Sequence, residues 1–505
     1  MVNMASTRKL YSKYKEQMQQ IADIRYAAAV LQWDQETYMP ARSIGHRARQ
    51  IATLSETAHK LFTAKKTGQL LETLAGSGDL SEEERKNIEL SLYDYNKLKK
   101  LPATFVRAMS EAVSKSYQYW AHAKAANSFE TFEDPLDKLI HLKRREASQL
   151  GWEGHPYNAL LNDYERGCTV SFLDAAFSGL RPPLSALLSS IARQPQVDNA
   201  FLQKHYPREL QWQFGLEIIK KLGFDFEAGR QDISEHPFTT SFSSTDVRVT
   251  TRISENDFSN MCWSCIHETG HALYEQGLPA EEYGLPLGEY SSLSIHESQS
   301  RLWENNVGRS QGFWQHHFPL LLTYFPEQLG STDPVHFYKA INRVQASLIR
   351  TEADELTYHF HVMIRYELEK GLIEGSVKTH DIPAFWNELY EKYLGIGVPD
   401  DRNGCLQDVH WSHGSFGYFP TYSLGSLYAA QFYDAALKQI PGLEQDLQNG
   451  NTTPLLAWLR EQVHQHGRKW TSDELCKNIT GESLNSVYFL EYAAKKYHNI
   501  YNFTD

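Results

Sequence analysis

The sequence predicts a mostly helical protein that forms one large body. Apolar side chains recur at spacings of three and four residues along most of the 505-residue chain. A strand-like pattern stands out at one place only, residues 236–253. No Gly/Ser-rich, Pro-rich or low-complexity linker divides the chain, and no repeat of fixed period is found. We therefore expect a single domain over residues 1–505, with two lobes around a groove.

The helical segments follow in chain order. The first is expected over residues 10–31, and a second over residues 81–100 begins with a serine cap followed by acids. A third, residues 133–151, is expected to have Asp134 as its cap and Gly151 at its end. The same periodicity predicts helices over residues 186–194, 210–223, 443–450 and 455–467.

Residues 236–253 break the helical pattern. They are rich in Thr, Ser, Val and Phe, with partial alternation of apolar and polar side chains, which is typical of a strand or hairpin. The segment comes shortly before the stretch CIHETGHALYEQGL, residues 265–278. We expect the hairpin to lie beside that helix. Its edge can pair with an extended peptide backbone, or it can simply support the helix.

Composition excludes several classes of partner. The chain carries 62 acidic and 50 basic residues, a net charge of −12, which argues against nucleic acid or an anionic membrane. No run of eighteen apolar residues occurs, and the N-terminal twenty residues lack the apolar core of a secretion signal. Five scattered cysteines fit reduced thiols, and the pair Cys262 and Cys265 is expected to pack within a helix. We expect a cytoplasmic protein.

The stretch 265–278 contains an H-E-x-x-H motif. On a helix, His267 and His271 share one face and direct two imidazoles to one point, with Glu268 beside them. Two histidines bind zinc well, and an adjacent carboxylate can take a proton from a water that the metal activates. The alternative is an ordinary polar helix face, because so short a motif also arises by chance. Apolar neighbours on both sides favour the metal site, since buried unpartnered histidines are costly.

A catalytic zinc site needs a third protein ligand. Glu275 lies one turn beyond His271 on the same helix, where it would crowd the metal. Residues 291–308 predict a second helix with Glu297 in its middle and Glu304 seven residues later. A glutamate from a neighbouring helix is the expected third ligand, and the apolar context favours Glu297 over Glu304.

Several short motifs, in order along the chain, together resemble one known family. The sequence is similar to the thermostable carboxypeptidase (carboxypeptidase Taq) family of zinc metallocarboxypeptidases. The matching pieces are LQWDQETYMP (31–40), HPF (236–238), DVRVT (246–250), HETGH (267–271), HESQ (296–299), IRTEAD (349–354) and GCLQDVHW (404–411).

The resemblance implies a mostly helical fold with a deep groove and a small sheet beside the zinc helix, similar to neurolysin and angiotensin-converting enzyme. It implies zinc, with cobalt as a possible substitute, on His267, His271 and Glu297, and Glu268 as general base. It also implies a homodimer that removes single residues from peptide C-termini with broad specificity.

An enzyme of this kind must recognise a free C-terminal carboxylate. Arginine suits this task because its planar fork binds both oxygens. Arg350 in IRTEAD and Arg248 in DVRVT are the candidates, with Arg350 preferred. Either can instead form a structural ion pair, because acidic residues lie close by in the sequence.

The segment 407–425 offers donors for the oxyanion that forms during hydrolysis. Tyr422 best matches the tyrosine that lies over the metal in the similar peptidases, with Tyr418 second and otherwise a substrate contact. His410, within the GCLQDVHW motif, is preferred to His413. Carboxylates are expected to hold the imidazoles from behind, and the candidates are Glu304, Asp354 and Asp408.

Two alternative functions share these motifs. A dipeptidyl carboxypeptidase or an oligo-endopeptidase would activate water in the same way and would differ only in where the substrate is anchored. A peptide-binding protein with a structural or lost metal site is the other alternative. The intact Glu268 speaks against it, because a binding module needs no general base.

Overall fold

A computed structural model describes residues 4–503, and these are mostly helical, as predicted. The elements are α1 (Met4–Thr37), α2 (Ile44–Phe62), α3 (Lys65–Ala75), α4 (Glu82–Lys99), α5 (Ala103–Ala126), α6 (Glu130–Leu150), α7 (Asn158–Leu161), α8 (Val170–Ala192), α9 (Arg208–Leu222), β1 (Gly229–Ile233), β2 (Thr239–Ser243), β3 (Asp246–Thr251), α10 (Phe258–Glu275), α11 (Leu293–Arg301), α12 (Gln311–Tyr324), α13 (Pro326–Leu329), α14 (Pro334–Ile341), α15 (Tyr358–Glu374), α16 (Ile382–Leu394), α17 (Pro420–Gln439), α18 (Leu443–Gln448), α19 (Thr453–Gln462), α20 (Ser472–Thr480) and α21 (Val487–Tyr501).

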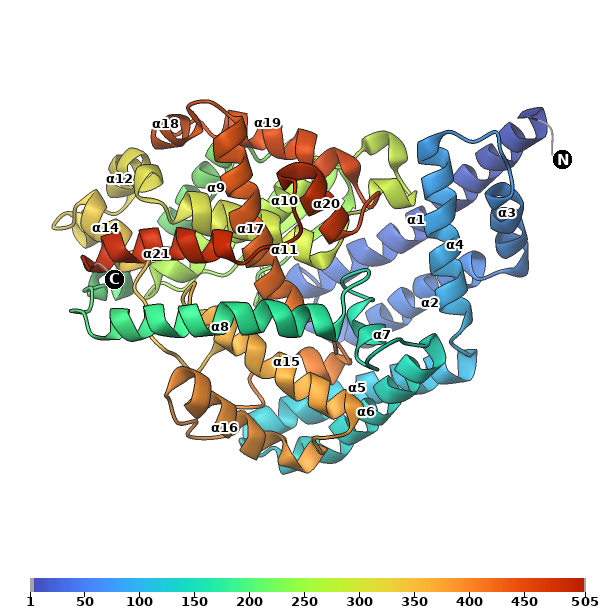
Figure 1. Cartoon of the computed structure of the whole chain (residues 1–505), viewed down its shortest axis with the longest axis horizontal. Helices are drawn as coiled ribbons and strands as arrows, with labels where there is room; N and C mark the ends of the chain where they lie inside the picture. The colour runs from blue at the N-terminus through green and yellow to red at the C-terminus, as the bar shows by residue number, and fades with distance from the viewer. Residues whose placement is uncertain (1–3, 504–505) are drawn as a thin grey trace.

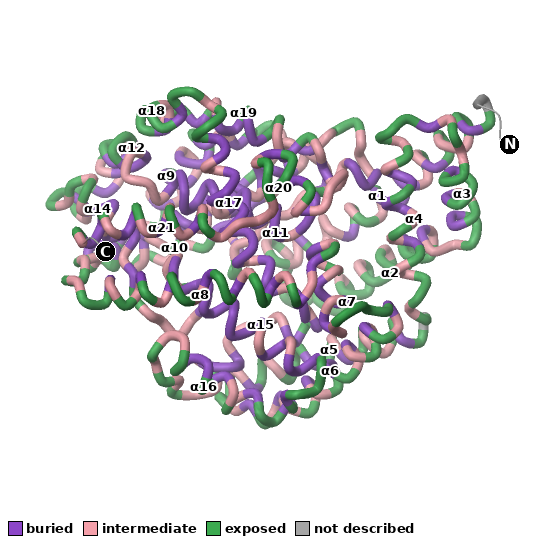
Figure 2. Tube along the Cα trace, in the orientation of Figure 1, coloured by how far each residue is buried: buried purple, intermediate pink, exposed green. Residues whose placement is uncertain are grey.

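Two hydrophobic cores organise these helices. Helices α1–α4 form one end of the molecule, at the right of Figure 1, and bury their own cluster of apolar side chains. That cluster includes Tyr14, Phe62, Leu71 and Ile88. A much larger core runs through the rest of the molecule, where α11 and α17 are buried along most of their length (Figure 2).

A three-stranded sheet lies against α10. Its order is β1-β3-β2, with β1 parallel and β2 antiparallel to the central β3. The predicted hairpin is therefore confirmed as β2 and β3, but the prediction of no other convincing strand was wrong. Strand β1, GRQDI, holds a single large apolar side chain, so it carries no alternating pattern and forms only because β3 pairs with it. Strands β1 and β2 are the two edges of the sheet.

The helix starts show where local signals were sufficient. Ser81 caps α4 in a capping box with Glu84, as the sequence predicts. Helix α6 begins at Glu130, one turn before the predicted cap Asp134. The backbone N–H of Phe129 donates instead to the carboxylate of Asp401, 2.8 Å away, so a distant loop satisfies this helix end.

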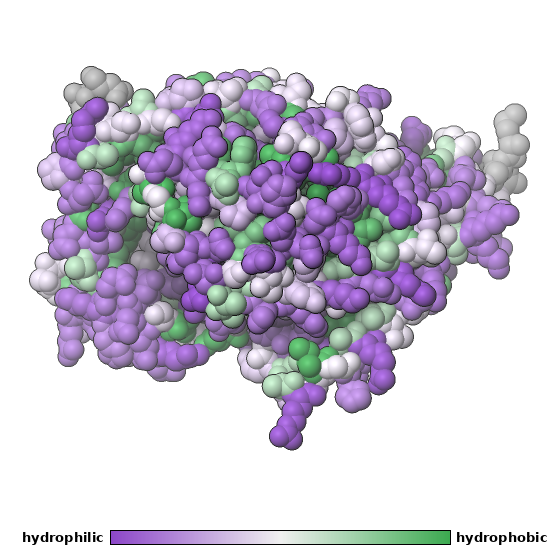
Figure 3. Space-filling view, turned by 90° about the horizontal axis from the view of Figure 1, so that it is seen from below, coloured by the Kyte–Doolittle hydropathy of each residue, from purple (hydrophilic) through white to green (hydrophobic). Residues whose placement is uncertain are grey.

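The surface and the cysteines agree with the composition. The face drawn in Figure 3 is largely hydrophilic, with hydrophobic residues scattered among charged and polar ones. Among residues 4–503, no helix combines the length and apolarity needed to cross a bilayer. All five cysteines are buried and free, and Cys262 and Cys265 pack within α10 as predicted.

Candidate metal centre

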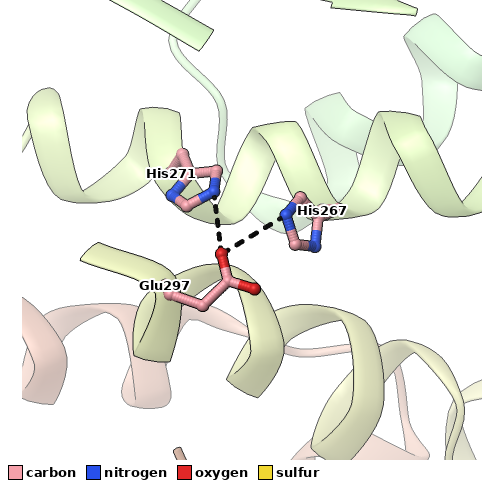
Figure 4. Close-up of side chains that lie close together, drawn as sticks. All are labelled: His267, His271 and Glu297. Atoms are coloured by element: carbon pink, nitrogen blue, oxygen red, sulfur yellow. Dashed lines mark ion pairs between the residues drawn. The ribbon is translucent and has the colours of Figure 1, made fainter. Parts of the chain in front are cut away.

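Helix α10 presents two histidines to one side. Its start is capped by Asp257, whose side chain accepts from the N–H of Ser259, and apolar residues bury the rest of its surface. His267 and His271 lie one turn apart, and their side chains project from the same face of the helix (Figure 4). Burial, together with the neighbouring His296, lowers the pKa of His271 to about 3, so its imidazole is neutral and able to bind a metal.

Helix α11 brings Glu297 to these imidazoles. Its start is capped by Ser292, whose hydroxyl accepts from the N–H of Ile295. One carboxylate oxygen of Glu297 lies 3.7 Å from Nε2 of His267 and 3.4 Å from Nε2 of His271 (Figure 4). The three potential ligand atoms all lie within 4.8 Å of one another. The structure thus brings together the three residues that the sequence suggested as metal ligands.

Two glycines allow the helices to approach this closely. A Cβ on Gly270 would lie 2.5 Å from Cα of Ser300, on the backbone of the neighbouring α11. A Cβ on Gly425 of α17 would lie 2.4 Å from Cγ of Glu297. Both positions therefore require the absence of a side chain, because such short contacts would displace α11 or its glutamate.

A buried network supports His267 and Glu297 from behind. Nδ1 of His267 lies 2.8 Å from Glu304, which follows α11 in a π-helical turn, Leu302–Gly308. Arg301 donates to Glu297 at 2.7 Å and to Glu304 at 3.2 Å, and Arg309 donates to Glu304 at 3.0 Å. Burial by itself raises the pKa of Glu297, but Arg301 and the imidazoles outweigh it and hold that pKa well below its usual range.

The charges around these residues fit a divalent cation. Four carboxyl groups face two guanidinium groups in this largely buried cluster, and the pKa values of Glu297 and Glu304 are held well below their usual range. The groups are Glu268, Glu275, Glu297, Glu304, Arg301 and Arg309. Buried charges need partners, and two imidazoles with one carboxylate form one of the donor sets of catalytic zinc sites. His267, His271 and Glu297 are thus suited to hold such an ion.

Glu268 lies beside the predicted ligands but is held by a strand. The hydroxyl of Thr239 on β2 donates to the Glu268 carboxylate at 2.6 Å. Burial raises the pKa of this carboxyl above its ordinary value, against the opposing effects of His267 and Thr239. A raised pKa brings a carboxylate closer to the range in which a general base works well at neutral pH.

These residues open into one large cavity of about 1420 Å³. Its walls come from α1, from the β2–β3 hairpin, from α10 and α11, and from the start of α17. His267, Glu268, His271 and Glu297 line it, together with the predicted Tyr418 and Tyr422. Helix α1, from the α1–α4 end of the molecule, and elements of the larger part therefore border the same space, with the edge strand β2 along one side.

The predicted His410 lies behind Tyr422 rather than on the cavity wall. Its Nε2 atom is 3.1 Å from the hydroxyl of Tyr422, and burial together with Arg350 lowers the pKa of His410 to about 3. A neutral His410 with its proton on Nε2 can donate to the Tyr422 oxygen, which orients the phenol and leaves the phenol proton free for another acceptor. His413 is exposed and stacks on Tyr117, away from this pair.

Arg350 is also buried behind Tyr422, 4.9 Å from its ring centre. It donates to Asp408 at 2.9 Å and to the hydroxyl of Tyr358 at 3.0 Å. Arg365 is fully buried and donates to the same Asp408 at 2.7 Å. Two guanidiniums thus share one carboxylate, and neither has another acidic partner among the described residues. One buried positive charge remains unmatched, which favours an anionic ligand nearby.

Arg248 and Asp354 have other partners. Arg248 makes two hydrogen bonds to Asp246, at 3.0 and 3.1 Å, and its guanidinium lies 4.3 Å from the ring centre of Trp33. Asp354 accepts from Thr357 and from nearby backbone N–H groups at the start of α15. Of the three carboxylates suggested as supports for the imidazoles, Glu304 alone contacts one directly.

Sequence reasoning missed several residues of this centre. Arg301 had a detectable signal, because it lies four residues after Glu297 and three before Glu304 on one helix face. Thr239 and Gly425 had none, since each meets the centre from a distant segment.

Comparisons match this chain to known proteins over almost its full length. The family model described as carboxypeptidase Taq (M32) metallopeptidase matches residues 13–497. Carboxypeptidase 1 of Bacillus subtilis (strain 168) is 38% identical over 486 residues, which cover 96% of this chain and 97% of that protein. The M32 carboxypeptidase structure from Deinococcus radiodurans R1 is 40% identical, with a TM-score of 0.96 over 98% of this chain and 100% of that one. A structure described as CHT is 58% identical, with a TM-score of 0.95 over 97% of this chain and 99% of that one.

Proposed function

This chain belongs to the carboxypeptidase Taq (M32) family of metallopeptidases and is a metal-dependent carboxypeptidase, and on that premise we propose how its residues act. His267, His271 and Glu297 hold a zinc ion, for which cobalt can substitute. The enzyme removes single residues from the free C-termini of peptides, with broad specificity. The observation that carries this proposal is the convergence of two imidazoles and one carboxylate within 4.8 Å, beside a buried Glu268 in a large cavity.

The chemistry divides between the metal and the side chains. When bound, zinc lowers the pKa of a water molecule and polarises a carbonyl group. Glu268 takes the proton of that water and returns it to the departing amine, while Thr239 keeps its carboxylate in place. The Tyr422 hydroxyl, oriented by His410, donates to the oxyanion that forms on the scissile carbonyl.

Two features of the cavity suit an extended peptide with a free carboxylate. The unpaired edge of β2 lines the cavity, so the substrate backbone can add to the sheet as a further strand. The unmatched positive charge of Arg350 and Arg365 lies behind Tyr422, and Arg350 anchors the C-terminal carboxylate. Tyr418 lines the wall next to Tyr422 and contacts the bound residue.

Removal of the metal is expected to abolish hydrolysis reversibly. A short N-blocked peptide with a free C-terminus is incubated with chelator-treated protein, with and without added Zn²⁺ or Co²⁺, and the products are followed by mass. Stepwise loss of single C-terminal residues, only with metal, is the expected result. Loss of dipeptides or internal cuts would contradict the proposed anchor, and metal binding without cleavage would favour a peptide-binding protein.

Replacement of Arg350 by methionine is expected to weaken discrimination for a free carboxylate. Asp408 keeps Arg365 as a partner, so no buried carboxylate is left unpaired. The ratio of kcat/KM for a free-acid peptide over its C-terminal amide should fall roughly 10- to 100-fold, because hydrogen bonds to charged groups contribute about 1.5–3 kcal/mol. Arg248→Met is the matched comparison. If that variant loses the discrimination and the Arg350 variant keeps it, Arg248 is the anchor.

We also propose a cytoplasmic homodimer with two lobes in one domain. The buried, free cysteines suit a reducing compartment. The helices around the separate core of α1–α4 form one lobe, and the large core forms the other, with α1 of the first lobe along the cavity wall. Light scattering of the purified protein tests the dimer directly.

A further inference from the structure

His296 lies beside one of the proposed metal ligands and, like it, lines the cavity. It precedes Glu297 on α11, and its Nδ1 atom is in hydrogen-bond contact with Nδ1 of His271. Its other ring nitrogen, Nε2, lies 2.7 Å from Oε1 of Glu275. Three side chains thus form a chain that leads from the proposed metal position to a buried carboxylate at the end of α10.

One arrangement of protons satisfies all of these contacts. Nε2 of His271 faces Glu297 at 3.4 Å, so a metal ligand must have its lone pair there and carry its proton on Nδ1. Nδ1 of His271 then donates, and Nδ1 of His296 must accept. His296 consequently carries its proton on Nε2, which donates to Glu275. With His271 as a metal ligand, each N–H in this series of three side chains therefore meets an acceptor.

The two proposed histidine ligands are therefore supported differently. His267 meets Glu304 directly, and Glu304 is also held by Arg301 and Arg309. Among the described residues, Glu275 has no arginine or lysine partner, and His296 is its one ion-pair contact. Removal of His296 would therefore leave both His271 and the buried Glu275 without their partner.

Aromatic packing keeps the His296 ring in place. Its centre lies 5.4 Å from that of Tyr274 and 4.9 Å from that of Tyr290. The His271 ring lies 4.6 Å away on the remaining side. Rotation of the imidazole would break these contacts as well as both hydrogen bonds, so the ring is fixed before any metal arrives.

We propose that His296, anchored by Glu275, is a positioning residue that holds His271 in the tautomer and orientation required for metal binding. This inference rests on the proposed ligand set His267, His271 and Glu297. It assigns no contact between His296 and the metal. Partners of this kind typically account for 10- to 100-fold in metal affinity.

The test compares the metal affinity of whole-protein variants by competition with a chelator. His296→Ala is expected to weaken Zn²⁺ and Co²⁺ binding about 10- to 100-fold and to change the visible absorption spectrum of the Co²⁺ form. His296→Gln is expected to restore much of the affinity, since its amide oxygen can accept from His271 and its NH₂ can donate to Glu275.

His464→Ala is the matched control. His464 is fully buried, and its ring packs 5.1 Å from that of Tyr274, as the His296 ring packs on the same tyrosine, but it hydrogen-bonds to Gln299 rather than to a proposed ligand. It should lower the melting temperature without changing metal affinity or the cobalt spectrum. If His296→Ala binds metal as tightly as the unmodified protein, or if His464→Ala weakens binding equally, the positioning role is wrong. Failure of the unmodified protein to bind either metal would instead reject the proposed ligand set.

Discussion

Glu268→Gln is expected to abolish peptide hydrolysis while the metal stays bound. Glutamine has the same shape, and its amide oxygen can still accept the hydrogen bond from Thr239, so the local structure is preserved. It cannot take a proton from water. Loss of a general base typically reduces turnover about 10²- to 10⁴-fold, and here the same group also returns the proton to the leaving amine.

The measurement pairs turnover of an N-blocked peptide with metal content. In the variant, kcat should fall by at least about 10²-fold, with unchanged metal stoichiometry and melting temperature. Glu281→Gln is a suitable control, because Glu281 is an exposed glutamate in a short helical turn next to the cavity wall. Normal turnover by the Glu268 variant with metal bound would reject the proposed proton transfer.

Gly270→Ala, in contrast to Glu268→Gln, is expected to weaken the binding of the metal itself. The added Cβ would lie 2.5 Å from Cα of Ser300 and 2.8 Å from the carbonyl oxygen of Gln299. Backbone atoms cannot rotate out of the way, so α10 and α11 must separate. Glu297, which lies on α11, then moves away from His267 and His271. Overpacking of this kind costs about 1–3 kcal/mol or more, equivalent to roughly a 10- to 100-fold loss of metal affinity.

Chelator competition and thermal unfolding both measure this effect. Gly45→Ala, in α2, provides the comparison, because no atom lies within 4 Å of the position where its Cβ would be placed. Alanine is the better helix former, so the Gly45 variant should keep its metal affinity and its melting temperature. Unchanged affinity in Gly270→Ala would mean that the helices can separate without opening the metal centre.

Much of the proposed centre follows from local sequence patterns. Two histidines four residues apart share a face on any regular helix, and the apolar residues on both sides of the motif favoured a buried helix there, which the structure shows as α10. The alternation in residues 236–253 likewise predicted β2 and β3. The ordered motifs indicated the carboxypeptidase Taq family, which the comparisons confirm.

Contacts between residues that are far apart in the sequence could not be predicted from such local patterns. Strand β1 has little β propensity of its own and depends on β3, and α6 begins at Glu130 because Asp401 satisfies its end. The sequence predicts Arg350 as the preferred candidate for binding the substrate carboxylate, but only the structure shows it buried against Asp408 and behind Tyr422. The choice of partner depends on which backbones come close, and spacing along the chain does not encode that.

By itself, the sequence determined the helical class, the family, and the pair of imidazoles with a glutamate beside them. The helical class and the imidazole pair depend on residues within a few positions of one another, where the helical repeat sets the geometry, and the family follows from the order of short motifs along the chain. Only the tertiary structure decided which carboxylate supports which imidazole. Glu304 reaches His267 across 37 positions, and Glu275 reaches His271 through His296. Those pairings exist because Gly270 and Gly425 let α10, α11 and α17 pack closely enough for the side chains to meet.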